Sequence, residues 1–411
     1  MGAISRAMTI NKKASDFLDV FPDCDIITKS TARSELLYKI TRRDSLRIKF
    51  GVDPTASELH LGWMVPLLRL KKLQDMGHTI VLVIGDFTAT IGDPSGKSGT
   101  RKQLSKDDVA AHAIELVHQF FHILDRSKTE VVFNSSWWSN VPAHEFINMC
   151  SSITVSQIME RNDFKSRFSE HSPIGLHEIL YPILQARDSV FIDCDVEVGG
   201  SDQRFNCLLG RDIMSNEGME PQTVVLTPLL VGLDGVKKMS QSLGNFISVR
   251  DESFDIFGKV MSINDDLMKN WWSLLQIPGE DEFIHDLESG VNPMILKKRL
   301  AFEIVKLICN EQSAISAQQD FEQKFVKKNW EEFAPEVVFK SDELVEMSAA
   351  SLLLSLGMVK STSEARRLII SGAVEIGGTK ITDPMLIVNM VDLIGKHVRV
   401  GKKRFAKLVT E

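Results

Sequence analysis

The sequence predicts an α/β protein with a doubly wound parallel sheet, followed by an α-helical region and a small α+β module. Ile48 to Val52 and Thr79 to Ile84 are apolar and β-branched, as strands buried in a parallel sheet are. Between them, Met64 to Met76 spaces its apolar residues with a helical period. The chain has 411 residues, 43% of them apolar. A single core stops growing at about 250 to 300 residues, so two or three domains are expected.

The later elements are predicted from the spacing of apolar residues and from the position of a proline. Asp265 to Leu275 and Met294 to Ile308 alternate apolar and charged residues at helical spacing, which predicts a helical region. Phe325 to Glu346 is charged and contains a proline, which is typical of a linker or a charged helix. We therefore assign residues 1–235 to the sheet domain, 236–330 to the helical domain, 331–346 to a linker and 347–411 to the small module.

The small module is basic. From Met347 to Glu411 there are ten Lys and Arg against five Asp and Glu, although the whole chain has a net charge of −7. A helix should start after Ser361 and end at Gly372, and a strand over Val374 to Ile376 should turn at the two following glycines. A compact basic unit of this kind suits contact with nucleic-acid phosphates.

Composition also excludes some classes of protein. The five cysteines are scattered without a CxxC spacing, which argues against a disulfide framework or a zinc site and favours the reducing cytoplasm. We predict no metal-binding residues. No apolar stretch approaches the roughly 18 residues that a membrane span needs, and the N-terminus lacks an export signal.

The most informative segment runs from Lys49 to Arg101. It begins KFGVDPTASELHLGW and ends VLVIGDFTATIGDPSGKSGTR, so it combines a strand, a turn, a helix and a second strand. The carboxyl ends of such strands meet at one crevice, which suits a bound nucleotide. A second polar element, KMSQS at Lys238 to Ser242, follows the apolar run Val224 to Leu233.

Together the two elements resemble the HIGH and KMSKS signatures of class I aminoacyl-tRNA synthetases. Further motifs look like those of tyrosyl-tRNA synthetases of the bacterial type: DPTA at 53–56, GDPSGK at 92–97, YPILQARD at 181–188 and GGSDQRFN at 199–206. The tail resembles an S4 RNA-binding domain. The resemblance extends from Lys49 to the C-terminus and implies a Rossmann-like catalytic domain.

The resemblance implies a two-step reaction. The carboxylate of L-tyrosine attacks the α-phosphate of ATP and releases pyrophosphate, and a ribose hydroxyl at the 3′ end of tRNA(Tyr) then displaces AMP. The implied partners are L-tyrosine, ATP with Mg²⁺, tRNA(Tyr) and a second copy of the chain in a homodimer. The helices around Ala143 to Ile158 are expected to supply the apolar contact between the subunits.

The resemblance also assigns roles to residues. Those expected to stabilise the reacting phosphates are His60, Lys238, Thr55, Lys97 and Arg101. Those expected to bind ATP are Asp53, Gly62, Trp63, Gly200, Asp202, Lys238 and Ser240. Those expected to bind tyrosine are Asp93, Tyr181, Gln185, Asp188 and Gln203, and those expected to bind RNA are Arg366, Arg367, Lys402 and Lys403.

The tyrosine set also has support from spacing alone. Tyr181, Gln185 and Asp188 are at i, i+4 and i+7, so they lie on one face of a helix and can enter one pocket. The resemblance makes Asp188 the expected acceptor for the phenol. Phenylalanine would leave this buried carboxylate without its partner, which costs free energy.

Three residues depart from the family pattern. Trp63 replaces the second histidine of the first signature and Gln241 replaces the second lysine of the other. Lys49 is found where many bacterial members have a tyrosine that contacts the phenol. Two alternatives stay open: a specialised paralogue that adenylates tyrosine or an analogue for a non-tRNA acceptor, and a non-catalytic RNA-binding protein.

Overall fold

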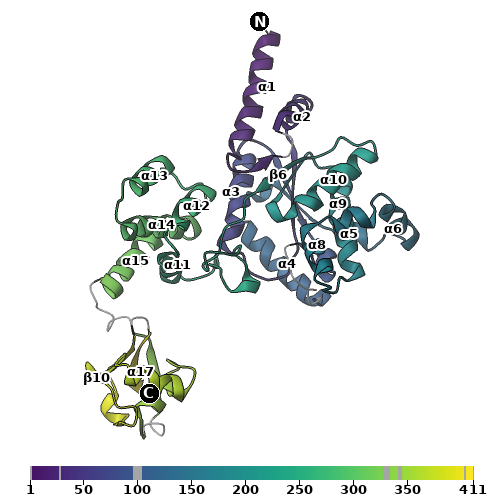
Figure 1. Ribbon diagram of the computed structural model, residues 1–411. Helices are drawn as coiled ribbons and strands as arrows, with labels where there is room; N and C mark the ends of the chain where they lie inside the picture. Colours follow the sequence, from purple (N-terminus) through teal and green to yellow (C-terminus); the bar gives the residue numbers. More distant parts are fainter. Residues whose placement is uncertain are drawn as a thin grey trace. The chain divides into compact units, whose positions relative to one another are not determined.

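The computed structural model describes residues 2–26, 29–95, 104–326, 334–340, 345–401 and 404–410. Its Cα positions form two compact units, Met1–Ile308 and Cys309–Glu411 (Figure 1). We describe each unit by itself.

The first unit contains a six-stranded sheet with the order β1-β6-β5-β2-β3-β4. Its strands are β1 (Asp25–Ile26), β2 (Arg47–Val52), β3 (Thr79–Ile84), β4 (Thr129–Phe133), β5 (Val196–Gly200) and β6 (Thr223–Thr227). β1 pairs antiparallel with β6, and the other neighbours run parallel. The order reverses between β2 and β5, and the crevice outside such a reversal is where open α/β sheets bind ligands.

Helices cover both faces of this sheet. Those before β5 are α1 (Gly2–Asp19), α2 (Lys29–Arg42), α3 (Leu61–Asp75), α4 (Lys106–Phe120), α5 (Ser135–Trp138), α6 (Ala143–Cys150), α7 (Val155–Met159), α8 (Asn162–Ser169) and α9 (Leu176–Ile192). β5 is followed by α10 (Arg204–Asn216). On one face, Ile48 and Phe50 of β2 pack in a core with α3 and α4, and on the other Val81 of β3 packs with residues at the end of α9.

A helical region completes the first unit. It comprises α11 (Ser253–Met261), α12 (Leu267–Leu274), α13 (Glu280–Glu288) and α14 (Pro293–Ile308). Trp272 of α12 stacks on Phe283 of α13 with ring centroids 3.9 Å apart. The region is bonded to the sheet domain, because Trp271 Nε1 donates to the Val231 carbonyl (3.0 Å) and Arg69 of α3 donates to the Leu274 carbonyl (2.9 Å).

The second unit begins with α15 (Glu311–Phe321) and contains two small sheets. Its further elements are β7 (Glu336–Phe339), β8 (Glu346–Ser348), α16 (Ala349–Ser355), α17 (Thr362–Ile370), β9 (Val374–Ile376), β10 (Thr379–Ile381), β11 (Ile387–Asn389), β12 (His397–Val400) and β13 (Arg404–Thr410). The larger sheet has the order β10-β9-β12-β13-β7, and β11 pairs with β8. Leu352, Ile369, Val398 and Leu408 are fully buried in its core.

The structure confirms the predicted fold class. The two predicted strands are β2 and β3, the helix between them is α3, and the helix predicted after Ser361 is α17. Ser361 caps α17 by accepting from the Glu364 backbone N–H at 3.2 Å.

The predicted boundaries differ from the two compact units. Residue 235 lies inside the first unit, which ends at Ile308 rather than at residue 330. The expected linker over 331–346 contains a strand, because Glu336–Phe339 pairs in parallel with β13 and Phe339 is buried in the core of the second unit. The charged composition of this segment concealed the alternation of Val337 and Phe339 with solvent-facing neighbours.

The second unit has its own core, so we predict that a fragment of residues 309–411 folds by itself. It should unfold in one cooperative transition in urea, monitored by circular dichroism. Leu408→Ala should destabilise the fragment by about 2–5 kcal/mol, as is usual when a fully buried leucine is truncated. A fragment without a cooperative transition would contradict the division into two units.

Candidate active site

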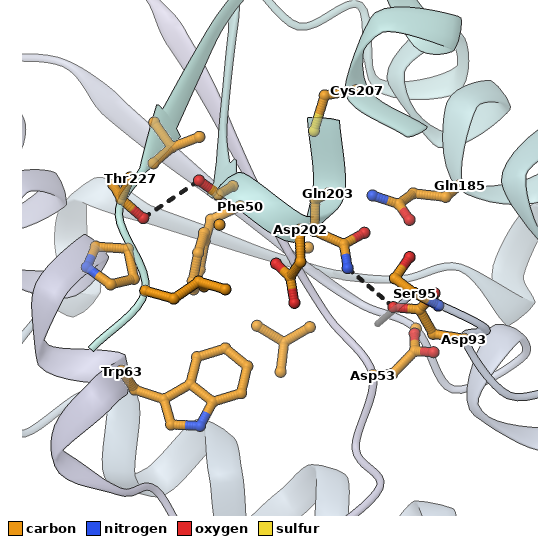
Figure 2. A pocket seen from close by; sticks show the side chains of 18 of the residues that line it. Phe50, Asp53, Trp63, Asp93, Ser95, Gln185, Asp202, Gln203, Cys207 and Thr227 are labelled. Atoms are coloured by element: carbon orange, nitrogen blue, oxygen red, sulfur yellow. Dashed lines mark hydrogen bonds between the residues drawn. The ribbon is translucent and has the colours of Figure 1, made fainter. Parts of the chain in front are cut away.

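A pocket of about 290 Å³ opens at the carboxyl ends of β2 and β5, where the strand order reverses (Figure 2). Most of the predicted site residues line it. They are Asp53, Thr55, His60, Gly62, Trp63, Asp93, Tyr181, Gln185, Asp188, Gly200, Asp202, Gln203, Lys238 and Ser240. Lys97 and Arg101 lie outside the described residues. One pocket therefore receives residues from both signature elements and from the predicted tyrosine set.

The HLGW turn begins α3. His60 is the N-cap residue, and its Nδ1 accepts from the Gly62 backbone N–H at 3.2 Å. Burial, with the charge of Lys238 nearby, lowers the pKa of His60 to about 4, so the ring is neutral at pH 7. A neutral ring that accepts at Nδ1 carries its proton at Nε2 and can donate it to a phosphate oxygen.

Close packing explains two of the predicted glycines. A Cβ on Gly62 would lie 2.9 Å from His60 Cε1, and one on Gly200 would lie 2.7 Å from Asp202 Oδ1. Both distances are shorter than real Cβ contacts. A side chain at position 62 would therefore collide with the His60 ring of the same turn.

The KMSQS loop is attached to the HLGW turn. Gln241 of the loop donates from Nε2 to the carbonyl of Glu58, two residues before the turn, at 3.0 Å, and Ser248, six residues after the loop, forms an isolated β-bridge with His60. Lys238 Nζ forms an ion pair with Asp202 Oδ2 at 2.5 Å. The lysine and the carboxylate expected to meet the phosphates and the ribose of ATP thus neutralise each other in this structure.

Trp63 forms part of an aromatic cluster beside the pocket. Its ring meets Phe50 and Phe120 edge to face, with centroids 6.1 and 6.3 Å away. Figure 2 shows the indole on the opposite side of the pocket from Gln185 and Ser95. The ring therefore supplies an apolar wall where the family signature has a histidine.

Asp53 is partly buried in the wall of the pocket, next to Tyr181. Its carboxylate accepts from the Thr88 hydroxyl at 2.7 Å and from the Tyr181 hydroxyl at 2.8 Å. Burial raises the pKa of Asp53 to about 7, with a further increase from Asp93 and Asp188, while the two hydrogen bonds oppose the increase. Asp53 therefore holds Tyr181 in position, and its contact with ATP stays a prediction.

Asp188 has an unusual set of donors. Its Oδ1 accepts from the indole N–H groups of Trp137 and Trp138, both at 2.9 Å, and its Oδ2 accepts from Asn134 Nδ2 at 3.2 Å. Burial raises the pKa of Asp188 to about 6, although Lys49 and these donors oppose the shift. A carboxylate has about four acceptor positions. Described residues occupy three of them, which leaves one on Oδ2.

Lys49 lies under the pocket and is fully buried. Its ammonium pairs with Glu197 at 2.7 Å and donates to Ser189 Oγ at 2.7 Å and to the Gln185 carbonyl at 3.0 Å. Burial acts to lower the pKa of Lys49, but the charges of Glu197 and Asp188 outweigh it and raise the pKa. An ammonium has three donors. All three are engaged, so Lys49 does not replace the phenol contact of the tyrosine found at this position in other members.

Several residues of the site were not predicted from the sequence. They are Asn134, Trp137 and Trp138 around Asp188, Glu197 beside Lys49, and Ser95, Arg161 and Asn206 near Gln185. Asn134 directly follows β4, and a polar residue at the carboxyl end of a parallel strand is a signal that could have identified it.

Two other predictions concern RNA and metals. Arg366 and Arg367 are exposed on α17, whereas Lys402 and Lys403 lie outside the described residues. In the part of the chain that the structure describes, no group of three or more His, Cys, Asp or Glu side chains could hold a metal ion.

The pKa of Asp53 leads to a prediction about stability. A folded-state pKa near 7, against 3.8 ordinarily, means that this carboxyl stabilises the fold at low pH and that the contribution is lost as the pH rises through 7. The wild type should lose stability between pH 5 and pH 8 as Asp53 ionises, whereas the Asp53→Asn variant has no group there to titrate. The difference in Tm, variant minus wild type, should therefore increase over this pH range. Differential scanning fluorimetry measures it, with the exposed Asp75→Asn as control. A difference independent of pH would contradict the assignment.

Comparisons with known proteins agree with this geometry. A family model described as tRNA synthetases class I (W and Y) matches residues 41–326, and an S4 domain model matches residues 350–394. The tyrosine–tRNA ligase of Desulfotalea psychrophila is 44% identical over 386 residues, which cover 92% of this chain and 94% of that protein. The tyrosine–tRNA ligase of Aquifex aeolicus is also 44% identical, over 377 residues and with the same coverage.

Solved structures share the fold. The C-terminally truncated mitochondrial tyrosyl-tRNA synthetase of Aspergillus nidulans superposes with a TM-score of 0.61 at 20% identity, covering 78% of this chain and 99% of that chain. No described helix is long and apolar enough to cross a membrane. The chain is similar to tyrosine–tRNA ligases over nearly its whole length, and both signature elements line one pocket. The chain therefore belongs to the tyrosine–tRNA ligase family of class I aminoacyl-tRNA synthetases.

Proposed function

We propose that the chain activates L-tyrosine with ATP and transfers the tyrosyl group to the 3′ end of tRNA(Tyr). The observation that carries the proposal is the buried carboxylate of Asp188. It lies in the same pocket as His60 and Lys238, and described residues leave it one acceptor position. That position suits a phenol hydroxyl, which donates one hydrogen bond.

In the first step, the tyrosine carboxylate attacks the α-phosphorus of ATP, and the bond to the pyrophosphate oxygen breaks. The nucleophile is already an anion, so no general base is required, and catalysis comes from positioning and electrostatic stabilisation. His60 Nε2–H, the Lys238 ammonium and the Thr55 hydroxyl are donors that the pocket offers to the phosphate oxygens. Asp202 would accept from the ribose hydroxyls once Lys238 has moved to the phosphates.

In the second step, the terminal ribose hydroxyl of tRNA attacks the carbonyl carbon of tyrosyl-adenylate, AMP leaves with the bonding electrons, and the departing phosphate takes up the hydroxyl proton. The S4 domain match and the exposed Arg366 and Arg367 support tRNA as the acceptor. They argue against a paralogue with a small-molecule acceptor, and the assembled pocket argues against a non-catalytic RNA-binding protein.

Mg²⁺ belongs to the proposal only as the counter-ion of ATP, because the described residues include no group fitted to hold a metal. Among the described residues, Cys24, Cys150, Cys194 and Cys207 are free thiols, which supports a cytoplasmic location.

We propose in addition that the chain is a homodimer. Large apolar side chains are exposed on the segments between β4 and α9: Ile147 (69% exposed), Val155 (63%), Phe168 (69%) and Leu176 (71%). Exposed large apolar side chains that are gathered in one part of a chain are typical of interaction sites. The range includes the predicted contact around Ala143 to Ile158.

The function is tested by tyrosine-dependent exchange of pyrophosphate into ATP and by charging of a tRNA(Tyr) transcript. The expected result is exchange with tyrosine, little with phenylalanine or tryptophan, and charging of the transcript. Exchange without charging would favour the paralogue, and binding of RNA without exchange would favour the non-catalytic alternative.

The role of Asp188 gives a prediction about specificity. Asp188→Asn replaces one acceptor oxygen by a donor, so kcat/KM for tyrosine in the exchange assay should fall about 10- to 100-fold, the usual effect of losing a hydrogen bond to a charged group. The value for phenylalanine should change little. Asp86→Asn is the matched control, since Asp86 is bonded to Ser135 at 2.9 Å. An unchanged ratio of tyrosine to phenylalanine would contradict the assignment.

The dimer gives a prediction about mass. Light scattering after size-exclusion chromatography should give twice the chain mass of 46.1 kDa for the wild type and a single chain mass for Phe168→Asp. The control is Ile114→Asp, at a similarly exposed position (62%) on α4, which should remain dimeric. A monomeric wild type would refute the proposal.

A further inference from the structure

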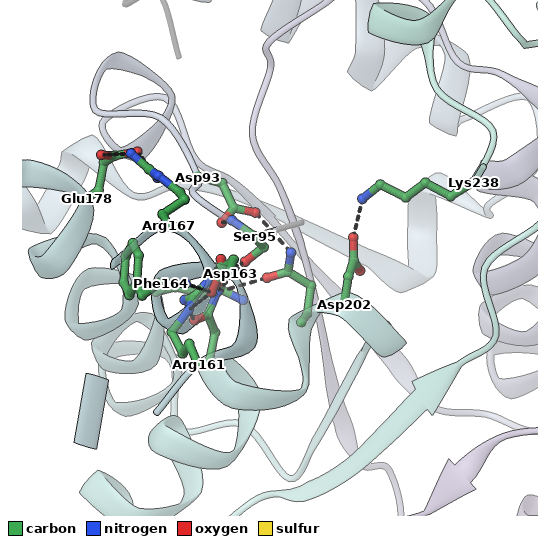
Figure 3. A network of polar contacts seen from close by, with 12 residues as sticks. Asp93, Ser95, Arg161, Asp163, Phe164, Arg167, Glu178, Asp202 and Lys238 are labelled. Carbon is green, nitrogen blue, oxygen red and sulfur yellow. Dashed lines mark hydrogen bonds and ion pairs between the residues drawn. The ribbon is translucent and has the colours of Figure 1, made fainter. Parts of the chain in front are cut away.

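A chain of hydrogen bonds connects Arg161 to the tyrosine-binding residues (Figure 3). Arg161 Nη1 donates to Asn206 Oδ1 at 2.8 Å. Asn206 Nδ2 in turn donates to Gln185 Oε1 at 2.8 Å and to Gln203 Oε1 at 3.0 Å. Gln203 Nε2 donates to Asp93 Oδ2 at 2.9 Å. The chain therefore reaches three of the residues predicted to bind tyrosine.

Arg161 is held firmly at the start of this chain. Its side chain is 4% exposed and forms a two-point ion pair with Asp163, at 3.0 Å from Nε and 2.7 Å from Nη2. The guanidinium also lies 5.0 Å from the ring centre of Phe164 and 5.4 Å from that of Phe205. A planar guanidinium engaged on its edge and near two rings cannot rotate freely.

The direction of the hydrogen bonds follows from chemistry. A guanidinium donates and never accepts, so Asn206 must turn its oxygen toward Arg161. Its amide nitrogen then faces Gln185 and Gln203, and each glutamine must turn its oxygen toward Asn206. One buried cation thus fixes the orientation of three amides that could otherwise flip.

This orientation determines what the pocket offers to a substrate. The Oε1 atom of Gln185 uses one lone pair for Asn206 and keeps a second one. Asp93 is held by Gln203 and by the Ser95 backbone N–H, which donates to Asp93 Oδ1 at 2.8 Å. Ser95 itself is tied to Arg161, since Nη2 donates to its hydroxyl at 3.0 Å. The carbonyl and carboxylate oxygens that result are acceptors for an ammonium group.

We propose that Arg161 is a positioning residue which, through Asn206 and Ser95, orients Gln185, Gln203 and Asp93 to accept the α-ammonium group of the amino-acid substrate. This inference rests on the proposed function. Arg161 does not touch the substrate, and its effect is confined to the part of the pocket that binds the ammonium group.

The test variant is Asn206→Asp. Aspartate keeps the size of the side chain and strengthens the pair with Arg161, so the protein should fold. Its second oxygen cannot donate to Gln185 or Gln203, and both amides should reorient. The expected result in pyrophosphate exchange is a rise in the KM for tyrosine of about tenfold or more, with the KM for ATP within about twofold of the wild type.

A pair of inhibitors separates this role from a general structural one. Tyramine and 4-ethylphenol both carry the phenol and lack a carboxylate, but only tyramine has an ammonium group. The wild type should bind tyramine more tightly than 4-ethylphenol in competition with tyrosine. Asn206→Asp should lose most of that preference and bind 4-ethylphenol as the wild type does.

Matched variants of two arginines complete the test. Arg161→Lys keeps the charge and one donor direction, so it should reduce the preference for tyramine less than Asn206→Asp does. The control is Arg167→Lys on α8. The Arg167 guanidinium donates to the Glu178 carboxylate at 2.9 and 3.0 Å, and this variant should leave the preference for tyramine over 4-ethylphenol unchanged.

The outcomes are distinguishable. A wild type without tyrosine-dependent exchange overturns the proposed function. An active wild type with an unchanged tyramine preference in Asn206→Asp overturns the inference alone, as does an equal loss in Arg167→Lys.

Discussion

The structure of the site depends on placing carboxylates where water is excluded. An unpaired charge is costly in the protein interior, so each buried carboxylate needs donors. Asp188 has two indoles and an amide, Asp53 has two hydroxyls, and Glu197 has the ammonium of Lys49. These donors come from β2, α5, α9 and the segments between them. The hydrogen bonds and the ion pair that stabilise these carboxylates therefore also hold the surrounding strands and helices in place around the pocket.

This constraint separates two ends of one pocket. At the first end, acceptors predominate, because Asp93, Gln185 and Asp188 line the cavity there and all three side chains carry acceptor oxygens. At the other end, His60 and Lys238 are donors and Trp63 supplies an apolar wall. An amino acid with a phenol and an ammonium group suits the first end, and a nucleotide suits the second. The reacting carboxylate and α-phosphate would then meet between them, at the reversal of strand order between β2 and β5.

The sequence was sufficient for the fold class and for the signature residues, because both depend on local patterns. Apolar runs predicted β2 and β3, and the spacing of Tyr181, Gln185 and Asp188 predicted a shared helical face. The partners of the buried charges could not be predicted in the same way. Trp138 meets Asp188, and Arg161 meets Asn206, only after distant segments have folded together, and no local pattern marks these pairs. The same holds in the second unit, where β7 pairs with β13, which lies far along the chain, so the local sequence of β7 did not predict a strand.

The central claim is that Asp188 recognises the phenol through its remaining acceptor position. A crystal structure with bound L-tyrosine tests this most directly. The account predicts a phenol oxygen within about 2.5–3.0 Å of Asp188 Oδ2, with both indole N–H groups still bonded to Oδ1. A phenol that bonds elsewhere, or a carboxylate that leaves the two tryptophans to reach it, would contradict the account.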